Sequence, residues 1–339
     1  MSAENPVRCA VLGAGSFGTC FAILLAERGF EVDLWARDAH VADAIAKHAR
    51  NPRYLTDFPL PESVRATASL ERALADKELI VSVVPSHALR EVWLRARHLI
   101  RPDALIVSAS KGIEVGTGKL CSEVLMEILP RELHDRLCFL SGPSFAREIA
   151  ERRPTAVALA ANNENYAVAA QSLISSPQFR CYTNSDVIGV ELGGALKNVI
   201  AIAVGVADGM ESGLNSRAAL ITRGLAEMTR LGVAMGANPV TFLGLAGVGD
   251  LVLTCTGDLS RNRRVGLEIG RGRKVDEVLG ELTQVAEGVR TAKSAYELAQ
   301  KLGVDMPITT GVYGMLFEGK NPIEAAIELR SRQLKSETE

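Results

Sequence analysis

The amino-acid sequence predicts an α/β protein: a doubly wound parallel sheet over residues 1–185, followed by an all-α domain over residues 186–339. Three observations lead to this prediction. Short apolar, β-rich segments alternate with helical segments in the first half of the chain. A glycine-rich segment directly follows the first apolar segment. From about Asp186 onward the β-rich pattern stops and helical spacing takes over.

Length and composition agree with two globular domains. The chain has 339 residues, and domains average roughly 150 residues. Hydrophobic residues make up 47% and charged residues 23%, which excludes a disordered or fibrous protein. The formal net charge is -2, so no basic excess indicates a nucleic-acid partner. No stretch reaches the ~18 uncharged apolar residues of a membrane span.

The cysteines form no metal-binding or disulfide pattern. None is paired as C-x-x-C, and none has a histidine at ligand spacing, so we expect no metal site, reduced thiols and a cytoplasmic location. The N-terminus has no basic segment before a long apolar one, so no signal peptide is predicted. The cysteines are Cys9, Cys20, Cys121, Cys138, Cys181 and Cys255.

Strands and helices alternate along the first half. A first helix is expected at Ser16–Arg28, and helical segments fall between most of the later strands. Such alternation favours right-handed crossovers and parallel pairing, with ligands at the carboxyl ends of the strands. The predicted strands are Val7–Gly13, Phe30–Ala36, Leu79–Val84, Ala104–Ala109, Leu137–Ser141, Ala156–Ala160 and Phe179–Thr183.

The glycine-rich segment runs from Gly13 to Gly18 with the spacing G-x-G-x-x-G, between a strand and a helix. Gly13 permits a tight turn, Gly15 lets the backbone approach a pyrophosphate, and Gly18 lets the helix pack closely on the strand. The helix N-terminus then offers N–H groups and a partial positive charge to phosphates. The pattern predicts a Rossmann-type dinucleotide site.

The end of the second strand bears on which dinucleotide is bound. A site for NAD usually has an acidic residue there, which holds the ribose 2′-hydroxyl. Arg37 stands at that position and suits a 2′-phosphate, while Asp38 follows it and remains able to reach the ribose. We therefore expect NADPH to be preferred, with NADH still possible; an exposed loop arginine is the alternative.

Later strand ends supply further candidates for the same crevice. The loops at 84–86, 110–114 and 141–146 each follow a predicted strand. Lys111 lies in the second of these loops and could contact an anion or a carbonyl oxygen. A solvated surface lysine is the alternative interpretation.

The second half is predicted to be helical, docked on the first half with a substrate cleft between them. The segment Asp186–Asp208 contains little but small and apolar side chains, so it must be buried on most faces. Its largely apolar character also makes a homodimer plausible. Further helices are expected at Ser216–Met235, Asn262–Gly270, Thr291–Leu302, Pro307–Phe317 and Pro322–Arg332.

Lys197 is the main catalytic candidate. At helical spacing it neighbours Gly193, Gly194 and Ala201, so its ammonium group should be partly desolvated. Desolvation lowers the pKa of a lysine toward neutrality and suits it to general acid–base catalysis. The alternative is that the side chain extends to solvent.

Two later segments carry polar candidates. Asp250 follows Gly247 and Gly249 in a glycine-rich turn, from which it could pair with Lys197 or bind a substrate hydroxyl. Ser260 is a natural N-cap, and Arg261 follows it at the start of a helix, which suits a phosphate. A capped surface helix is the alternative, although the helix dipole disfavours cations there.

Together these segments resemble the bacterial NAD(P)-dependent glycerol-3-phosphate dehydrogenases over the full chain. The glycine motif is generic to dinucleotide-binding folds. The helix that carries Lys197, the turn that carries Asp250 and the segment that begins at Ser260, in this order, are specific to the family. The resemblance rests on residues 13–18 (GAGSFG), 51–55 (NPRYL), 110–114 (SKGIE), 141–146 (SGPSFA), 191–200 (ELGGALKNVI), 247–255 (GVGDLVLTC), 260–264 (SRNRR) and 285–288 (VAEG).

The resemblance implies interconversion of dihydroxyacetone phosphate and sn-glycerol 3-phosphate with NAD(P)H, which supplies backbones for phospholipid synthesis. It implies that Lys197 is the proton acceptor and that Lys111 and Arg261 contact both ligands. Phe17 stands where family members often have Trp or Tyr, so a large aromatic is retained. Implied cofactor contacts are Ser16, Phe17, Arg37, Ala146, Val285 and Glu287; implied substrate contacts are Gly142, Ser144, Asp250, Ser260 and Asn262.

Three other functions remain open at this point. A related hydroxyacid or ketoacid reductase would share the two-domain plan but bind a carboxylate substrate. A catalytically silent NADP-binding sensor would keep the glycine motif but would not need Lys197 and Asp250. Covalent catalysis by Cys255 lacks a base partner in the sequence.

Overall fold

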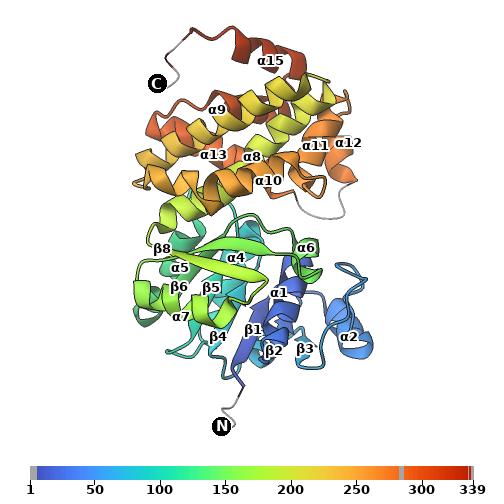
Figure 1. The fold of residues 1–339 in the computed structure, drawn as a ribbon, viewed down its shortest axis with the longest axis vertical. Helices are drawn as coiled ribbons and strands as arrows, with labels where there is room; N and C mark the ends of the chain where they lie inside the picture. The colour runs from blue at the N-terminus through green and yellow to red at the C-terminus, as the bar shows by residue number, and fades with distance from the viewer. Residues whose placement is uncertain (1–5, 282–285, 335, 337–339) are drawn as a thin grey trace.

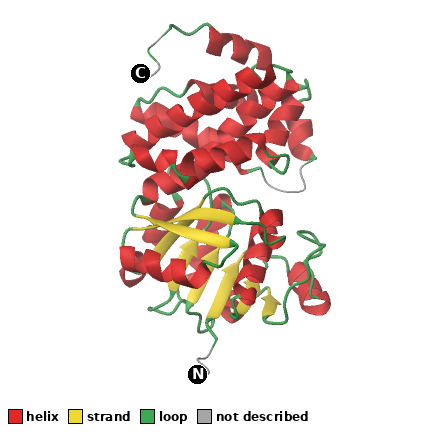
Figure 2. Cartoon of the chain, viewed as in Figure 1, coloured by secondary structure: helices red, strands yellow, loops and turns green. Residues whose placement is uncertain are grey.

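The structure, a computed structural model, describes residues 6–281, 286–334 and 336. It confirms the predicted fold class: one half of the molecule contains a mostly parallel sheet with helices, and the described residues of the other half form helices joined by loops (Figures 1 and 2). The sheet ends with β8 at Asn184, and the long helix α8 begins at Val187. The domain limits 1–185 and 186–339 remain predictions.

The sheet has eight strands in the order β3-β2-β1-β4-β5-β6-β7-β8. Neighbouring strands are parallel except β6 and β7. The register pairs Leu12 with both Trp35 and Ser82, so the ends of β1, β2 and β4 lie together at one edge. The strands are β1 Arg8–Leu12, β2 Glu31–Trp35, β3 Val64–Thr67, β4 Leu79–Ser82, β5 Leu105–Ser108, β6 Leu137–Ser141, β7 Thr155–Ala161 and β8 Phe179–Asn184.

Two features of the sheet differ from the sequence prediction. The strand β3 was not predicted, because its four residues are mostly half-buried or exposed and give no apolar run. The sheet is parallel as predicted except between β6 and β7, which pair in antiparallel orientation. The helix between them, α6 (Ala146–Ala150), has five residues and spans only about 7.5 Å. That is too short to carry the chain back along the sheet, so β7 runs in the opposite direction.

Helices cover both faces of the sheet. One face packs against α1, α2, α6 and α7, and the other packs against α3, α4, α5 and the first turn of α8. These helices are α1 Ser16–Glu27, α2 Ala39–His48, α3 Leu70–Leu74, α4 Ser86–Ala96, α5 Cys121–Ile128 and α7 Glu164–Ile174, with a 3-10 turn η1 at Arg131–Arg136.

The helical half is built around α8 (Val187–Gly209), which begins after its N-cap Asp186. Nearly all of its residues are buried, as the small and apolar sequence predicted. The other expected helices form within a few residues of the predicted limits, as α9 Gly213–Ala234, α11 Arg261–Gly270, α13 Glu287–Leu302, α14 Pro307–Phe317 and α15 Pro322–Arg330. Two helices were not predicted, α10 Asp250–Thr256 and α12 Val275–Gly280. A 3-10 turn, η2 at Pro239–Leu243, and a π turn, η3 at Leu245–Gly249, lie between α9 and α10.

The helices α8 and α11 touch through their backbones. A Cβ atom at Gly205 of α8 would lie 2.1 Å from the Arg263 carbonyl oxygen, and one at Gly266 of α11 would lie 2.0 Å from the Ile202 carbonyl oxygen. Gly209 and Gly270, four residues further along each helix, make equally close contacts. Because no Cβ separates the two helices, the start of α11 is held beside the middle of α8.

The helix α8 is also long and apolar enough, by composition alone, to cross a membrane. In the structure 94% of its most apolar window is buried inside the protein. It is therefore a core helix. Beyond its first turns, which pack against the sheet, it runs among other helices of the same half (Figure 1).

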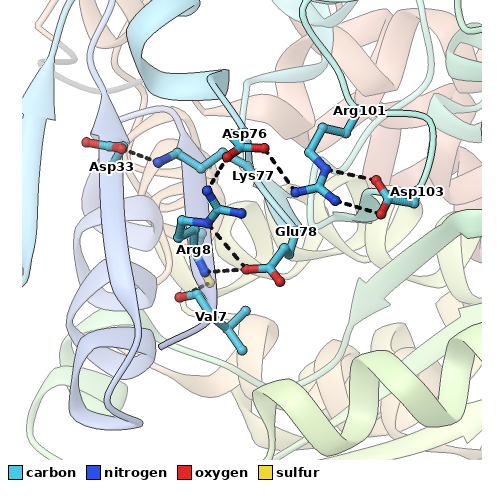
Figure 3. A network of polar contacts seen from close by, with 9 residues as sticks. Val7, Arg8, Asp33, Asp76, Lys77, Glu78, Arg101 and Asp103 are labelled. Carbon is cyan, nitrogen blue, oxygen red and sulfur yellow. Dashed lines mark hydrogen bonds and ion pairs between the residues drawn. The ribbon is translucent and has the colours of Figure 1, made fainter. Parts of the chain in front are cut away.

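Figure 3 shows a network of ion pairs near the start of β1 and β4. Lys77 pairs with Asp33, and Arg8 pairs with Asp76. Arg101 bridges Asp76 at 3.0 Å and Asp103 at 2.7 Å. At this end of the sheet the charged side chains neutralise one another, whereas at the carboxyl ends of the strands several face a cleft.

Candidate active site

A cleft of about 430 Å³ lies between the sheet and the helical half. Its wall combines the glycine-rich loop, the ends of β4 and β5, the start of α6, and residues of α8, α10, α11 and α13. The structure thus brings together the two halves of the predicted site. The predicted residues on this wall are Gly15, Ser16, Phe17, Gly18, Lys111, Ser144, Ala146, Lys197, Ser260, Arg261, Asn262 and Glu287.

The geometry of the glycine-rich loop fits a dinucleotide pyrophosphate. Gly13 has φ +116°, and its N–H donates to the Trp35 carbonyl oxygen at 3.0 Å. A Cβ on Gly18 would lie 1.7 Å from the Gly13 carbonyl oxygen, so only glycine allows this helix–strand contact. Gly15 faces open space on the cleft side and caps α1 without any side-chain hydrogen bond. The first N–H groups of α1 are left for a ligand.

Lys197 is buried beside the cleft, and its side chain is 9% exposed. Its ammonium group donates to Oδ1 of Asp250, and the Lys111 ammonium donates to Oδ2 of the same carboxylate at 3.1 Å. Burial is the largest influence on Lys197, opposed by the Asp250 charge and reinforced by Lys111, and together they lower its pKa to about 8. Lys197 can therefore both donate and accept a proton near neutral pH.

Asp250 is the hub of this arrangement, with 1% exposure. The predicted glycine-rich turn before it is a π turn, η3, in which Gly247 has a non-helical backbone (φ −96°, ψ −105°), and Asp250 begins α10. The Thr254 hydroxyl donates to the Asp250 carbonyl oxygen at 2.6 Å. Asp250 is not among the cleft-lining residues, so its implied substrate contact remains a prediction.

A chain of buried amides joins three helices at the other end of the cleft. Asn262 donates from Nδ2 to Oδ1 of Asn198 at 2.8 Å, and its own Oδ1 accepts from the Gly288 N–H at 3.0 Å. Ser260 accepts from the Arg263 N–H at 3.2 Å, which confirms its role as the N-cap of α11. These contacts fix the start of α11, with Arg261 on the wall, as a donor-rich end facing the cleft.

Glu287, the first residue of α13, lies on the same wall. Burial raises the pKa of its carboxyl, and the charges of Arg261 and Lys111 partly offset this. Ala146, at the start of α6, lines the cleft from the sheet side. Val285 lies outside the described residues.

Besides Asp250, three described residues of the predicted site do not line the cleft. Gly13 supports the loop from behind. Gly142 has φ +140°, and a Cβ there would lie 2.9 Å from the Val157 Cα, so its glycine is explained by packing against β7. Ser144 nevertheless reaches the cleft, and its hydroxyl donates to the Gly142 carbonyl oxygen at 2.8 Å. Arg37 follows β2 and is exposed.

Sequence reasoning missed several residues of the cleft wall. Thr254 stands one helical turn after Asp250, and this spacing could have indicated it. Tyr54 and Leu55 come from the loop after α2, which has no periodic pattern. Arg147 and Leu259 are further unpredicted wall residues, whereas Pro85 and Phe145 lie in the strand-end loops that were predicted to line the crevice.

The chemistry of the site excludes one of the alternatives. Cys255 is fully buried, and burial raises the pKa of its thiol to about 12, so it is a poor nucleophile. Among the residues that the structure describes, no group of three or more His, Cys, Asp or Glu side chains could hold a metal ion.

Two models of one enzyme family match the two halves of the chain. The model of the NAD-dependent glycerol-3-phosphate dehydrogenase N-terminus matches residues 8–167, and the model of the C-terminus of the same enzyme matches residues 186–327. The chain belongs to the NAD-dependent glycerol-3-phosphate dehydrogenase family.

Individual relatives of this family are similar over nearly the whole chain. The glycerol-3-phosphate dehydrogenase [NAD(P)+] of Citrifermentans bemidjiense is 54% identical over 330 residues, covering 97% of this chain and 98% of the relative. That of Myxococcus xanthus is 52% identical, covering 98% and 99%. A crystal structure of glycerol-3-phosphate dehydrogenase from Coxiella burnetii superposes with a TM-score of 0.91 at 41% identity, covering 96% and 99%.

A more distant likeness extends to the fold alone. A ketopantoate reductase from Ralstonia eutropha has a TM-score of 0.60 at 15% identity, covering 94% of this chain and 100% of that one. The two-domain plan is thus shared with reductases that lie outside the glycerol-3-phosphate dehydrogenase family.

Proposed function

We propose that this enzyme interconverts dihydroxyacetone phosphate and sn-glycerol 3-phosphate with NAD(H) or NADP(H), and so supplies glycerol phosphate for phospholipid synthesis. The observation that carries the proposal is the position of Lys197, with Asp250 and Lys111, between a dinucleotide-type glycine loop and the donor-rich start of α11. The full-length similarity to glycerol-3-phosphate dehydrogenases [NAD(P)+] agrees with it.

The dinucleotide supplies or accepts the hydride when it is bound. The residues that would hold it are the glycine-rich loop, with Ser16 and Phe17, together with Ala146 on the sheet side and Glu287 on the helical side of the cleft. This assignment is supported by the open space at Gly15 and the uncapped start of α1.

Lys197 is the proposed general acid and base. In its ammonium form it donates to the oxygen of the C2 carbonyl as this becomes a hydroxyl, and in its neutral form it accepts the proton in the reverse reaction. Asp250 holds the ammonium groups of both Lys197 and Lys111, so two cations can face a single carbonyl oxygen. This concentrates positive charge where negative charge develops.

The start of α11 is proposed to bind the substrate phosphate. Ser260 caps the helix, Arg261 adds a guanidinium group, and the N-terminal N–H groups favour an anion. Binding at the phosphate, away from the reacting carbon, orients the carbonyl for reaction.

The test is an NADPH-oxidation assay with dihydroxyacetone phosphate, repeated with NADH and with a panel of 2-ketoacids. We expect turnover of the phosphate ester and none of the ketoacids. Turnover of a ketoacid instead would support the rival reductase, and absence of any turnover with intact NADPH binding would support a sensor.

We further propose that NADPH is preferred to NADH. Asp38 is already engaged, since its carboxylate accepts from the His40 N–H at 3.0 Å and pairs with Arg53 at 2.9 Å. Arg37 beside it is exposed and available for a 2′-phosphate. Arg37→Ala should raise the KM for NADPH about tenfold or more and leave that for NADH nearly unchanged. A wild-type enzyme with a strong preference for NADH would refute the proposal.

The finer points of assembly and location are also proposals. We propose a homodimer, because the helical half exposes large apolar side chains such as Leu214 at 73%, Leu243 at 68% and Val240 at 66%. Light scattering at several concentrations tests this. A cytoplasmic location is supported by six free, buried thiols; cell fractionation tests it.

A further inference from the structure

The loop between α2 and β3 supplies part of the cleft wall. Tyr54 and Leu55 lie on this wall at its tip. An antiparallel bridge joins Arg50 and Pro59, so the two ends of the loop meet at its base. In a loop of this form, the position of the tip is fixed by the contacts that the loop makes with neighbouring segments.

Asn51 is the buried tie. It is 0% exposed, and its amide makes four hydrogen bonds. On one side Nδ2 donates to the Ala14 carbonyl oxygen at 2.9 Å and to Oγ1 of Thr19 at 2.8 Å. On the other side Oδ1 accepts from the N–H groups of Arg53 at 3.0 Å and Tyr54 at 3.1 Å. The amide nitrogen therefore donates to the glycine-rich loop and to α1, and the amide oxygen accepts from N–H groups of its own loop.

The loop needs such a tie because its tip is strained. Leu55 has φ +52°, a left-handed conformation that a leucine adopts only where its surroundings impose it. The ion pairs that join the loop to its neighbours, Arg53 with Asp38 and Arg147 with Asp57, involve largely exposed side chains. Exposed ion pairs contribute little to stability.

We propose that Asn51 is a positioning residue of the dinucleotide site, which joins the loop of Tyr54 and Leu55 to the glycine-rich loop before the dinucleotide binds. The inference rests on the proposed use of this cleft by NAD(P)H. Because Asn51 fixes two parts of the same wall relative to each other, its loss should weaken dinucleotide binding more than it slows the proton and hydride transfer.

The variant Asn51→Asp distinguishes the hydrogen bonds that Asn51 donates from those that it accepts. The aspartate keeps an acceptor for the N–H groups of Arg53 and Tyr54, but it loses both donors and places a carboxylate against the Ala14 carbonyl oxygen. Thr309→Val is the matched control, since the Thr309 hydroxyl is buried and bonds to Glu227 at 3.1 Å in the helical half, far from the loop in sequence. Both variants lose buried hydrogen bonds.

Two readouts are taken. The first is the rate of tryptic cleavage after Arg50 and Arg53, both exposed, in the enzyme without nucleotide. The second is NADPH binding and the separate KM values for NADPH and dihydroxyacetone phosphate. For Asn51→Asp we expect cleavage at least fivefold faster, a Kd and KM for NADPH about tenfold higher, and a kcat within threefold of wild type. Thr309→Val should change none of these by more than twofold.

Either of two results would overturn the proposal. One is an Asn51→Asp enzyme with wild-type cleavage and an NADPH Kd within twofold of wild type. The other is equal changes in kcat and both KM values in Asn51→Asp and Thr309→Val, which would mean a purely structural role. If Asn51→Asp does not fold, Thr19→Val, which removes one acceptor, carries the same test with about threefold effects. An inactive wild-type enzyme would refute the proposed reaction. The rate of tryptic cleavage and the Kd for NADPH would still test the positioning role of Asn51.

Discussion

Replacing Asp250 by asparagine tests the electrostatic basis of the site. The variant keeps the shape of the side chain and removes the one carboxylate to which Lys197 and Lys111 both donate. Lys197 is then left buried beside another cation. Because burial and Lys111 already lower its pKa while Asp250 raises it, the pKa must fall further.

The size of the effect follows from Coulomb's law. Two unit charges about 4 Å apart interact by about 4 kcal/mol at an effective dielectric constant of about 20. One pKa unit corresponds to about 1.4 kcal/mol. Loss of the carboxylate therefore lowers the pKa of Lys197 by up to about 3 units, from about 8 toward roughly 5. At pH 7 the protonated fraction falls from about nine-tenths to about one-hundredth.

The assay is the pH dependence of kcat for dihydroxyacetone phosphate reduction at saturating NADPH. In the wild type the rate should fall as the pH rises through about 8, because the proton donor is lost. In Asp250→Asn the fall should begin two to three pH units lower, by roughly the Coulomb shift above. Thr254→Val, which removes a hydroxyl 3.4 Å from Oδ1 of Asp250 but keeps the charge, should shift it by less than about one unit. A falling limb that stays near pH 8 in Asp250→Asn would refute this account.

Three further predictions concern catalysis, packing and pH-dependent stability. Lys197→Ala should lower turnover by ~10²-fold or more while the Kd for NADPH stays within a few-fold; near-normal turnover contradicts its assignment. Gly205→Ala should lower the free energy of unfolding by about 1–3 kcal/mol, whereas Gly280→Ala, where a Cβ meets nothing within 4 Å, should change it by less than about 0.5 kcal/mol; equal losses in denaturant titrations would argue against the helix contact. Burial raises the pKa of Glu191 to about 8, so the folded state holds a proton that the unfolded chain releases near pH 4.5, and stability declines as the pH rises between these values. Glu191→Gln should flatten that decline between pH 5 and 8, and an unchanged slope would count against it.

Local patterns in the sequence predicted most of the fold and the central lysine. Lys197 could be found because its neighbours on one helix, Gly193 and Gly194, already imply burial. The glycine-rich loop could be found because strand, loop and helix are consecutive. In both cases the physical cause lies within one turn or one connection of the residue itself.

Contacts between distant segments could not be predicted in this way. Lys111 and Asp250 are 139 residues apart, and no local pattern indicates that one carboxylate serves two lysines. Tyr54 joins the wall through a loop that is held by a buried amide rather than by periodic packing. The reversed strand β7 depends on the shortness of α6, which is a property of the connection and not of the strand.

The contact between α8 and α11 has a consequence for substrate selection. Since the helices meet through glycine backbones, the separation between Lys197 on one helix and Ser260 at the start of the other does not depend on any side-chain rotamer. Under the proposed function this separation acts as a ruler between the carbonyl and the phosphate of the substrate. Substituting the residues that contact the substrate would change its affinity but would leave the separation between Lys197 and Ser260 unchanged. An enzyme for a longer phosphorylated ketone would therefore need substitutions at the glycines between α8 and α11, because only a shift of one helix against the other changes the distance between Lys197 and Ser260.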